Sequence, residues 1–208
     1  MRAFMLVLSY FMSELLIETH PFPAIFPAHA KVMMMGTFPP KEDKRCMHFH
    51  YPNFQNDMWR IYGLVFFDDA TYFQIPDEKR FDPAKIEMFL RERGIALCST
   101  VQRAVREKEN ASDKFLTVVE PVDLAVALQQ VPDCRWLFTT GGKATEIILS
   151  LLKEKVNTPL TNQFVQFDYA GRKLRLYRLP STSRAYPMSL QNKAESYRTF
   201  FKLAGILP

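Results

Sequence analysis

Two segments of the chain combine side chains that could hold a planar ring and a phosphate group. The first, residues 36–59, starts at Gly36, is stiffened by Pro39 and carries several aromatic residues. Aromatic side chains in such a loop offer flat faces on which a planar ring can stack. The second, residues 179–189, places small hydroxyl residues beside Arg184, and this composition suits a phosphate held by backbone N–H groups. Taken separately, both segments also have plain structural interpretations, because aromatic residues usually pack in cores and hydroxyl residues commonly cap helices.

Four short strands would have to position these segments. Continuous apolar runs without alternation indicate strands in a sheet that is covered on both faces. These runs are residues 31–36, 94–100, 135–140 and 173–179. Helical patterns lie between and after them, at residues 56–67, 83–93, 121–131, 142–155 and 190–203. We therefore expect an α/β fold, a three-layer α/β/α sandwich around a central, mostly parallel four-stranded sheet.

In such a sheet the ligand crevice lies beyond the carboxyl ends of the strands. The segments that follow the predicted strands, residues 37–56, 99–113, 140–143 and 180–189, are therefore where a site is expected. Two regions fit the pattern less well. Residues 107–114 are polar and interrupt it, and residues 158–172 could form a hairpin before the last strand, with Ala170-Gly171 as its turn.

Length and composition limit the classes that this chain can belong to. Its 208 residues suit one domain, which we take to be residues 1–208. Residues 1–12 are interpreted either as a packed terminal strand or as an extended start preceding Met12. The net charge of +5 is compatible with a polyanionic partner but does not require one. Three cysteines without a C-x-x-C pair argue against a disulfide framework or a zinc site, and no segment is expected to span a membrane.

Taken together, the two segments resemble the uracil-DNA glycosylase superfamily, most closely its hypoxanthine-DNA glycosylase branch and more distantly the mismatch-specific glycosylases. The family patterns are G-[ST]-x-P, an aromatic–Gly–His–Pro stretch, N-x-F-W and L-P-S-T-S-P-A. They correspond here to Gly36-Thr37-Phe38-Pro39, Phe49-His50-Tyr51-Pro52, Asn56-Asp57-Met58-Trp59 and Leu179-Pro180-Ser181-Thr182-Ser183-Arg184-Ala185. Residues 94–97 (GIAL) and 141–144 (GGKA) match in order between them, and the resemblance runs from about Thr19 to the C-terminus.

The resemblance implies a monofunctional DNA glycosylase that hydrolyses the N-glycosidic bond of a deaminated base, uracil or hypoxanthine, in base excision repair. The alternative is a catalytically silent relative that binds DNA or nucleotides. No cofactor and no metal are implied. The implied partner is DNA containing a damaged or mismatched base, bound by a monomer in the cytoplasm without membrane association.

The resemblance also assigns roles to individual residues. Asn56 is expected to be the catalytic residue, which orients a water molecule and hydrogen-bonds the sugar or the base, since a neutral amide is no strong base. The residues expected to bind the base are Gly36, Thr37, Phe38, Phe49 and Thr140. The residues expected to contact DNA are Pro39, Lys143, Ser181, Thr182, Ser183 and Arg184.

The chain departs from the family pattern at four points. Phe38 stands where many relatives have Asn, and two extra residues separate Pro52 from Asn56. Thr140 occupies the position of a base-reading Asn, and Arg184 replaces a usual Pro. Because threonine has one hydroxyl where asparagine has a donor and an acceptor, the preferred base stays open.

Other chemistries find less support in the sequence. Residues 141–143 (GGK) lack the spacing of a nucleotide phosphate loop, and Ser181 has neither a nucleophile elbow nor a histidine downstream. His48 and His50 form a single cluster with no second group of ligands, so no metal site is expected. For Asp57 two roles are possible, a carboxylate stabilised by the helix dipole or a second group for water activation, and we favour the first.

Overall fold

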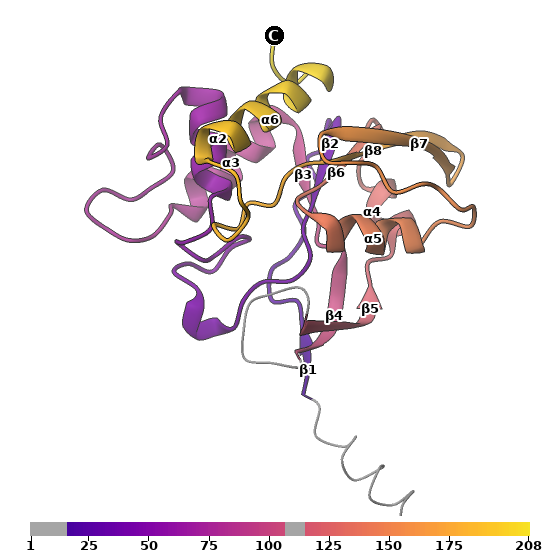
Figure 1. Ribbon diagram of the computed structural model, residues 1–208, viewed down its shortest axis with the longest axis horizontal. Coiled ribbons are helices and arrows are strands. Elements are labelled where there is room, and N and C mark those ends of the chain that lie inside the picture. Colours follow the sequence, from indigo (N-terminus) through magenta and orange to yellow (C-terminus); the bar gives the residue numbers. More distant parts are fainter. Residues whose placement is uncertain (1–15, 107–114) are drawn as a thin grey trace, which may run out of the picture.

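The computed structural model describes residues 16–106 and 115–208 (Figure 1). Its central sheet has the strand order β3-β2-β6-β8-β7. The bounds of these strands are β2 Val32–Met35, β3 Ile95–Leu97, β6 Trp136–Thr139, β7 Gln163–Tyr169 and β8 Arg172–Arg178. The four strands predicted from apolar runs are all present and mutually parallel.

Helices cover both faces of this sheet, which confirms the α/β architecture (Figure 1). On one face lie α2 Met58–Phe67, α3 Pro83–Arg93 and α6 Leu190–Leu203, and on the other α4 Leu124–Gln129 and α5 Gly142–Ser150. Strand β2 explains the continuous apolar pattern, because all four of its residues are buried. Val32 and Met34 pack in the core under α2 and α6, whereas Met33 and Met35 pack against α4 and α5.

Local signals set several helix boundaries. The side chain of Asp82 accepts a hydrogen bond from the backbone of Lys85, and Pro83 occupies the first helical turn of α3. Gly94 ends the same helix with φ 64°, a left-handed conformation that glycine adopts without steric cost. The side chain of Ser189 caps α6 by accepting from Asn192 N.

The prediction of a four-stranded, mostly parallel sheet is wrong in one respect, because the sheet has a fifth, antiparallel edge strand, β7. The hairpin of β7 and β8 turns at Ala170-Gly171, both with positive φ. Strand β7 is half-exposed along its length, as edge strands are, so its sequence lacks the continuous apolar run by which the other strands were recognised.

A second, three-stranded sheet was not predicted. It consists of β1 Ile17–Thr19, β4 Val101–Arg106 and β5 Leu116–Pro121, in the order β1-β4-β5. Much of the segment predicted as a functional loop at residues 99–113 is therefore strand β4. The polar interruption at residues 107–114 and the alternatives for residues 1–12 lie outside the described residues.

The topology brings four chain segments to one edge of the central sheet. Strands β2, β3, β6 and β8 are parallel, so their carboxyl ends meet at this edge. After β2 the chain continues to β3, which pairs with β2 on one side. It then crosses to β6, which pairs with β2 on the other side. A crevice outside the strand ends at such a reversal is the usual ligand site of an open α/β sheet.

Candidate active site

A cavity of about 270 Å³ opens at the carboxyl edge of the central sheet. Its lining comes from the segments that follow β2, β3, β6 and β8, and from residues that precede β2. The lining residues are His20, Phe22, Gly36, Thr37, Phe38, Pro39, Pro40, His50, Tyr51, Pro52, Asn53, Gln55, Asn56, Leu97, Ser99, Thr140, Ser181, Thr182, Ser183, Arg184 and Ala185. Its size is close to the lower limit of small-molecule sites, roughly 300 Å³.

One wall carries a pair of hydroxyl groups. The phenolic oxygen of Tyr51 lies 3.0 Å from Oγ1 of Thr140, and the two groups share a hydrogen bond. Tyr51 itself has φ 52°, and its ring lies edge-on to Trp59. Gly36 makes this arrangement possible, because a Cβ atom there would lie 2.5 Å from the Tyr51 hydroxyl. Gly36 therefore allows the tyrosine to approach the end of β2 and reach Thr140.

Replacing Gly36 by alanine should destabilise the protein by about 1–3 kcal/mol, the usual cost of overpacking. The new methyl group would push the Tyr51 hydroxyl away from Thr140. The double variant Gly36→Ala/Tyr51→Phe should recover part of this loss, since phenylalanine lacks the oxygen that clashes. Urea denaturation of the two single variants and the double variant measures the coupling, and strictly additive effects would contradict this packing.

A second wall carries two histidines, His20 and His50, whose ring centres are 5.4 Å apart. Nε2 of His50 lies 2.8 Å from the carbonyl oxygen of Pro23, and Nδ1 of His20 lies 3.0 Å from that of Phe22. Burial is the main reason why the pKa of His50 falls to about 3 and that of His20 to about 4. Both imidazoles are therefore neutral at pH 7.

These histidines should make the protein lose stability in mild acid. A pKa below the unfolded value of 6.5 means that the unfolded chain binds more protons, so stability falls as the pH drops below about 6.5. Between pH 7 and pH 5 we expect each of the two histidines to contribute a loss of up to about 2 kcal/mol, because both folded-state pKa values lie well below 5. Urea denaturation at both pH values tests this. His50→Phe should reduce the pH dependence of stability by about half, because the contribution of His20 remains.

Asn56 lies in the turn before α2 and lines the cavity. Its Oδ1 accepts a hydrogen bond from the backbone N–H of Met58 at 2.9 Å. Because a backbone N–H can only donate, this contact fixes which end of the amide is oxygen. Among the described residues, the Nδ2 amide group has no hydrogen-bond partner, so it remains as a donor at the cavity.

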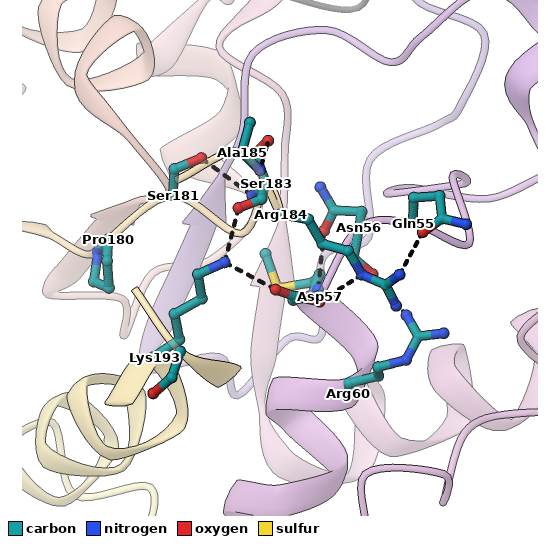
Figure 2. Close-up of polar contacts among 12 residues, drawn as sticks. Gln55, Asn56, Asp57, Arg60, Pro180, Ser181, Ser183, Arg184, Ala185 and Lys193 are labelled. Atoms are coloured by element: carbon teal, nitrogen blue, oxygen red, sulfur yellow. Dashed lines mark hydrogen bonds and ion pairs between the residues drawn. The ribbon is translucent and has the colours of Figure 1, made fainter. Parts of the chain in front are cut away.

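A buried ion pair fastens the loop of residues 181–185 to α2 and α6, as Figure 2 shows. Nζ of Lys193 lies 2.8 Å from Oδ2 of Asp57 and 2.7 Å from the carbonyl oxygen of Ser183. The side chains are buried, with exposed fractions of 1% for Lys193 and 9% for Asp57. The backbone N–H of Asp57 also donates to Thr182 O at 2.9 Å. Asp57 stands at the N-cap of α2, the end of a helix where the dipole favours a carboxylate, and its charge is also paired with that of Lys193.

Arg184 lines the cavity and its side chain is half-exposed. Figure 2 shows it beside Asp57 and Gln55. Its Nε lies 3.3 Å from Oδ1 of Asp57, and its guanidinium also bonds to Gln55. Arg60 lies next to it, stacked on Phe54, and the pKa of Arg60 is lowered by burial and by the charge of Arg184. Arg184, which lines the cavity, and the neighbouring Arg60 therefore lie close to each other and to the carboxylate of Asp57.

No protein-family model and no curated protein sequence matches the chain. Among solved structures, the chain is similar to the solution NMR structure of a "putative uracil DNA glycosylase" from Methanosarcina acetivorans. The TM-score is 0.61 at 19% identity, over 91% of this chain and 99% of the other. The chain has the uracil-DNA glycosylase fold. The fold expected from the motifs is thereby confirmed, and the match extends over nearly the whole length of both chains.

On this uracil-DNA glycosylase fold, most of the site residues predicted from the sequence lie together at the cavity. These are Gly36, Thr37, Phe38, Pro39, Asn56, Thr140, Ser181, Thr182, Ser183 and Arg184. The hydroxyl groups of Ser181 and Ser183 accept hydrogen bonds from backbone N–H groups two residues further on, which makes this loop compact. Lys143 does not line the cavity. It lies in the first turn of α5, which follows Gly141 beside Ser181.

Phe49 is a correction to the predicted site. Its side chain is buried in the core and contacts Trp59 and His50 rather than lining the cavity. The exposed edge of this loop is instead formed by Tyr51, whose φ of 52° turns its side chain toward Thr140. The aromatic residues that line the cavity are Phe22, Phe38 and Tyr51, together with His20 and His50.

Sequence reasoning assigned no site role to His20, Tyr51 or Lys193. His20 lies before the first central strand, whereas site residues were expected only in the segments that follow the strands. Lys193 lies in a helix whose apolar spacing suggested core packing alone. One signal was available, because Lys193 falls on the buried face of α6, where an unpaired cation would be costly and an acidic partner is expected.

Two further observations concern metals and membranes. In the described ranges, no three His, Cys, Asp or Glu side chains are grouped in a way that could hold a metal ion. Cys46, Cys98 and Cys134 are free thiols, and burial raises the pKa of both Cys98 and Cys134 to about 12. None of the helices in residues 16–106 and 115–208 is long and apolar enough to cross a bilayer.

Proposed function

We propose that this protein is a DNA glycosylase that removes a deaminated base, uracil or hypoxanthine, in base excision repair. The observation that carries the proposal is the convergence of Asn56, Thr140 and the Ser181–Ala185 loop on one cavity in a uracil-DNA glycosylase fold. The segments come from distant parts of the sequence and meet because they follow parallel strands. We propose further that the enzyme is a single-domain monomer of the cytoplasm.

The reaction that this cavity would carry out is a hydrolysis. The C1′–N bond breaks and its electron pair leaves with the base, while the sugar gains oxocarbenium character. A water oxygen then bonds to C1′, and one proton of that water is released to neutralise the departing base. The target nucleotide must first leave the duplex, which costs a few kcal/mol. A cavity of about 270 Å³ beside the loop supports such a route.

Asn56 would act as a hydrogen-bond donor. Its Oδ1 caps Met58, so the amide offers N–H groups to the cavity. An N–H group aimed at the departing base stabilises the negative charge that develops there, and this charge exists only as the bond breaks. Asn56, which was expected to orient a water molecule and to hydrogen-bond the sugar or the base, would therefore act through its nitrogen, as a donor to the leaving base or to water.

The loop of residues 181–185 and the two arginines would hold the DNA backbone. Backbone N–H groups and hydroxyl groups suit phosphate oxygens, and Arg184 is half-exposed and lines the cavity. Because phosphate contacts release counterions, we expect the affinity for DNA to fall as salt rises. An affinity that does not depend on salt would contradict a phosphate-binding loop.

The experiment that tests the proposal is base release from duplexes that contain a single uracil, hypoxanthine or xanthine, with an undamaged duplex as control. Release of at least one deaminated base, with none from the control, is expected. The alternative function is a catalytically silent DNA- or nucleotide-binding protein, and the absence of the base-reading Asn at Thr140 is the observation that favours it. Binding of these duplexes without any base release would support the alternative.

A further inference from the structure

His50 presents one unused hydrogen-bonding atom to the cavity. Only 5% of the residue is exposed, and His50 is one of the residues that line the cavity. Nε2 lies 2.8 Å from the carbonyl oxygen of Pro23, which can only accept, so Nε2 carries the proton. Nδ1 is therefore the unprotonated nitrogen of this ring, a hydrogen-bond acceptor.

The Nδ1 atom of His50 is not sealed inside the protein. In residues 16–106 and 115–208, the buried side-chain atoms that lack a hydrogen-bond partner are Thr100 Oγ1 and Arg178 Nε. Nδ1 of His50 has no hydrogen-bond partner in these residues either, yet it is not one of these two buried atoms. It therefore contacts solvent. Since the residue is almost fully buried and lines the cavity, we take this contact to face the cavity.

The surroundings of His50 fix the ring and keep it neutral. The ring of Phe49 lies edge-on to it, with centres 5.6 Å apart, and His20 lies on another side. The indole N–H of Trp59 donates to the backbone carbonyl of His50 at 3.1 Å. Burial lowers the pKa of His50 to about 3. Nδ1 is thus an acceptor throughout the physiological pH range, and the hydrogen bond to Pro23 prevents a change of tautomer.

A fixed acceptor at this place can distinguish a deaminated base from its parent. Deamination replaces an amino group by a carbonyl, and the neighbouring ring nitrogen gains a hydrogen. Cytosine and adenine present a lone pair at that ring nitrogen, whereas uracil and hypoxanthine present an N–H group. An imidazole lone pair attracts the ring N–H group of uracil or hypoxanthine and repels the ring lone pair of cytosine or adenine.

We propose that Nδ1 of His50 accepts the hydrogen bond of the ring N–H that deamination creates, and so selects lactam bases. The inference rests on the proposed function and assigns base selection to a residue outside the position of the family's base-reading Asn. That position is Thr140, whose hydroxyl already shares a hydrogen bond with Tyr51. A site built to pair a ligand N–H group discriminates strongly against an analogue that lacks it, by several orders of magnitude in favourable cases.

The test uses binding rather than cleavage, in a protein carrying Asn56→Ala so that the duplex stays intact. The probes are duplexes with hypoxanthine or 1-methylhypoxanthine, and with uracil or 3-methyluracil, because the methyl group removes the N–H donor. We expect the unmethylated base to bind at least ~10-fold more tightly, about one hydrogen bond. Adding His50→Phe should abolish this preference, because phenylalanine keeps the wall of the cavity but offers no acceptor. Adding His50→Asn, which supplies a carbonyl oxygen, should retain part of it.

His20→Phe is the matched control, since it changes the neighbouring imidazole of the same wall. It should preserve the preference for the unmethylated base. A preference that survives His50→Phe would overturn the inference, because the discrimination would then be steric. If the preference were lost in His20→Phe but survived in His50→Phe, the selecting residue would be His20, and the inference would also be overturned.

Imidazole ¹⁵N spectra of the Asn56→Ala protein give a measurement that needs no substitution at His50. The Nδ1 resonance of His50 should move when the uracil duplex is added and stay in place with the 3-methyluracil duplex. An unmoved resonance with a bound uracil duplex would overturn the inference. If the wild-type protein neither releases nor prefers any deaminated base, the proposed function fails and this inference with it. Base release whose selectivity survives His50→Phe overturns the inference alone.

Discussion

Replacing Asn56 by alanine should lower the rate of base release by about 10²–10³-fold, the usual effect of removing one donor that stabilises charge in a transition state. The affinity for the duplex should change little, because the amide acts on charge that develops during bond breakage. The donor is available because Oδ1 already bonds to Met58 N at 2.9 Å. Single-turnover kinetics with a deaminated duplex, together with binding measurements, separates the two effects.

Asn53 provides a matched control for this experiment. It lines the same cavity, lies in the same loop, and its Oδ1 accepts from Gln55 N in the same local geometry. Asn53→Ala should therefore leave the rate within a few-fold of the wild-type value. If Asn56→Ala retained full activity, or if both variants lost it equally, the catalytic assignment of Asn56 would be wrong.

Replacing Lys193 by methionine should destabilise the protein by about 3 kcal/mol, because it leaves the carboxylate of Asp57 buried without its closest cation. Arg184 remains near that carboxylate but is half-exposed, so it compensates only in part. The carbonyl oxygen of Ser183 also loses its 2.7 Å hydrogen bond. The loop of residues 181–185 should become less well positioned, and base release should fall along with stability.

The double variant Asp57→Asn/Lys193→Met isolates the charge effect, because neither a buried cation nor a buried anion remains. It should be more stable than Lys193→Met alone, as measured by urea denaturation. Lys202→Met, on an exposed position of the same helix, should be close to neutral. A Lys193→Met protein as stable as Lys202→Met would show that this pair contributes nothing to holding the loop.

The sequence was most informative where pattern and burial coincide. Strand β2 is buried on both faces, so its apolar residues form one continuous run that is recognisable without a structure. Helix α3 has Asp82 and Pro83 at its start and Gly94 at its end, and its predicted bounds agree with the structure. Once the strands are known to be parallel, the convergence of Asn56 and Thr140 follows from topology alone.

The parts that were missed depend on contacts between distant residues. Strand β7 is an exposed edge without a continuous apolar run, so the sequence indicated only a possible hairpin at residues 158–172 and no fifth strand of the central sheet. Phe49 follows the family pattern in sequence, yet the chain around it turns its ring into the core against Trp59. Lys193 and Asp57 are 136 residues apart, and nothing local connects them. The local sequence around each residue does not indicate such long-range contacts, because they form only when the helices pack against each other.

The crystal structure of the protein with a duplex that carries a 2′-fluoro target nucleotide would test the central claim most directly. The fluorine disfavours the oxocarbenium-like transition state, so the base should remain attached. We predict an extruded base in the cavity, between Tyr51, Thr140 and Asn56, with flanking phosphates on Ser181 and Ser183. A target base still stacked in the duplex, or DNA bound away from this cavity, would contradict the account.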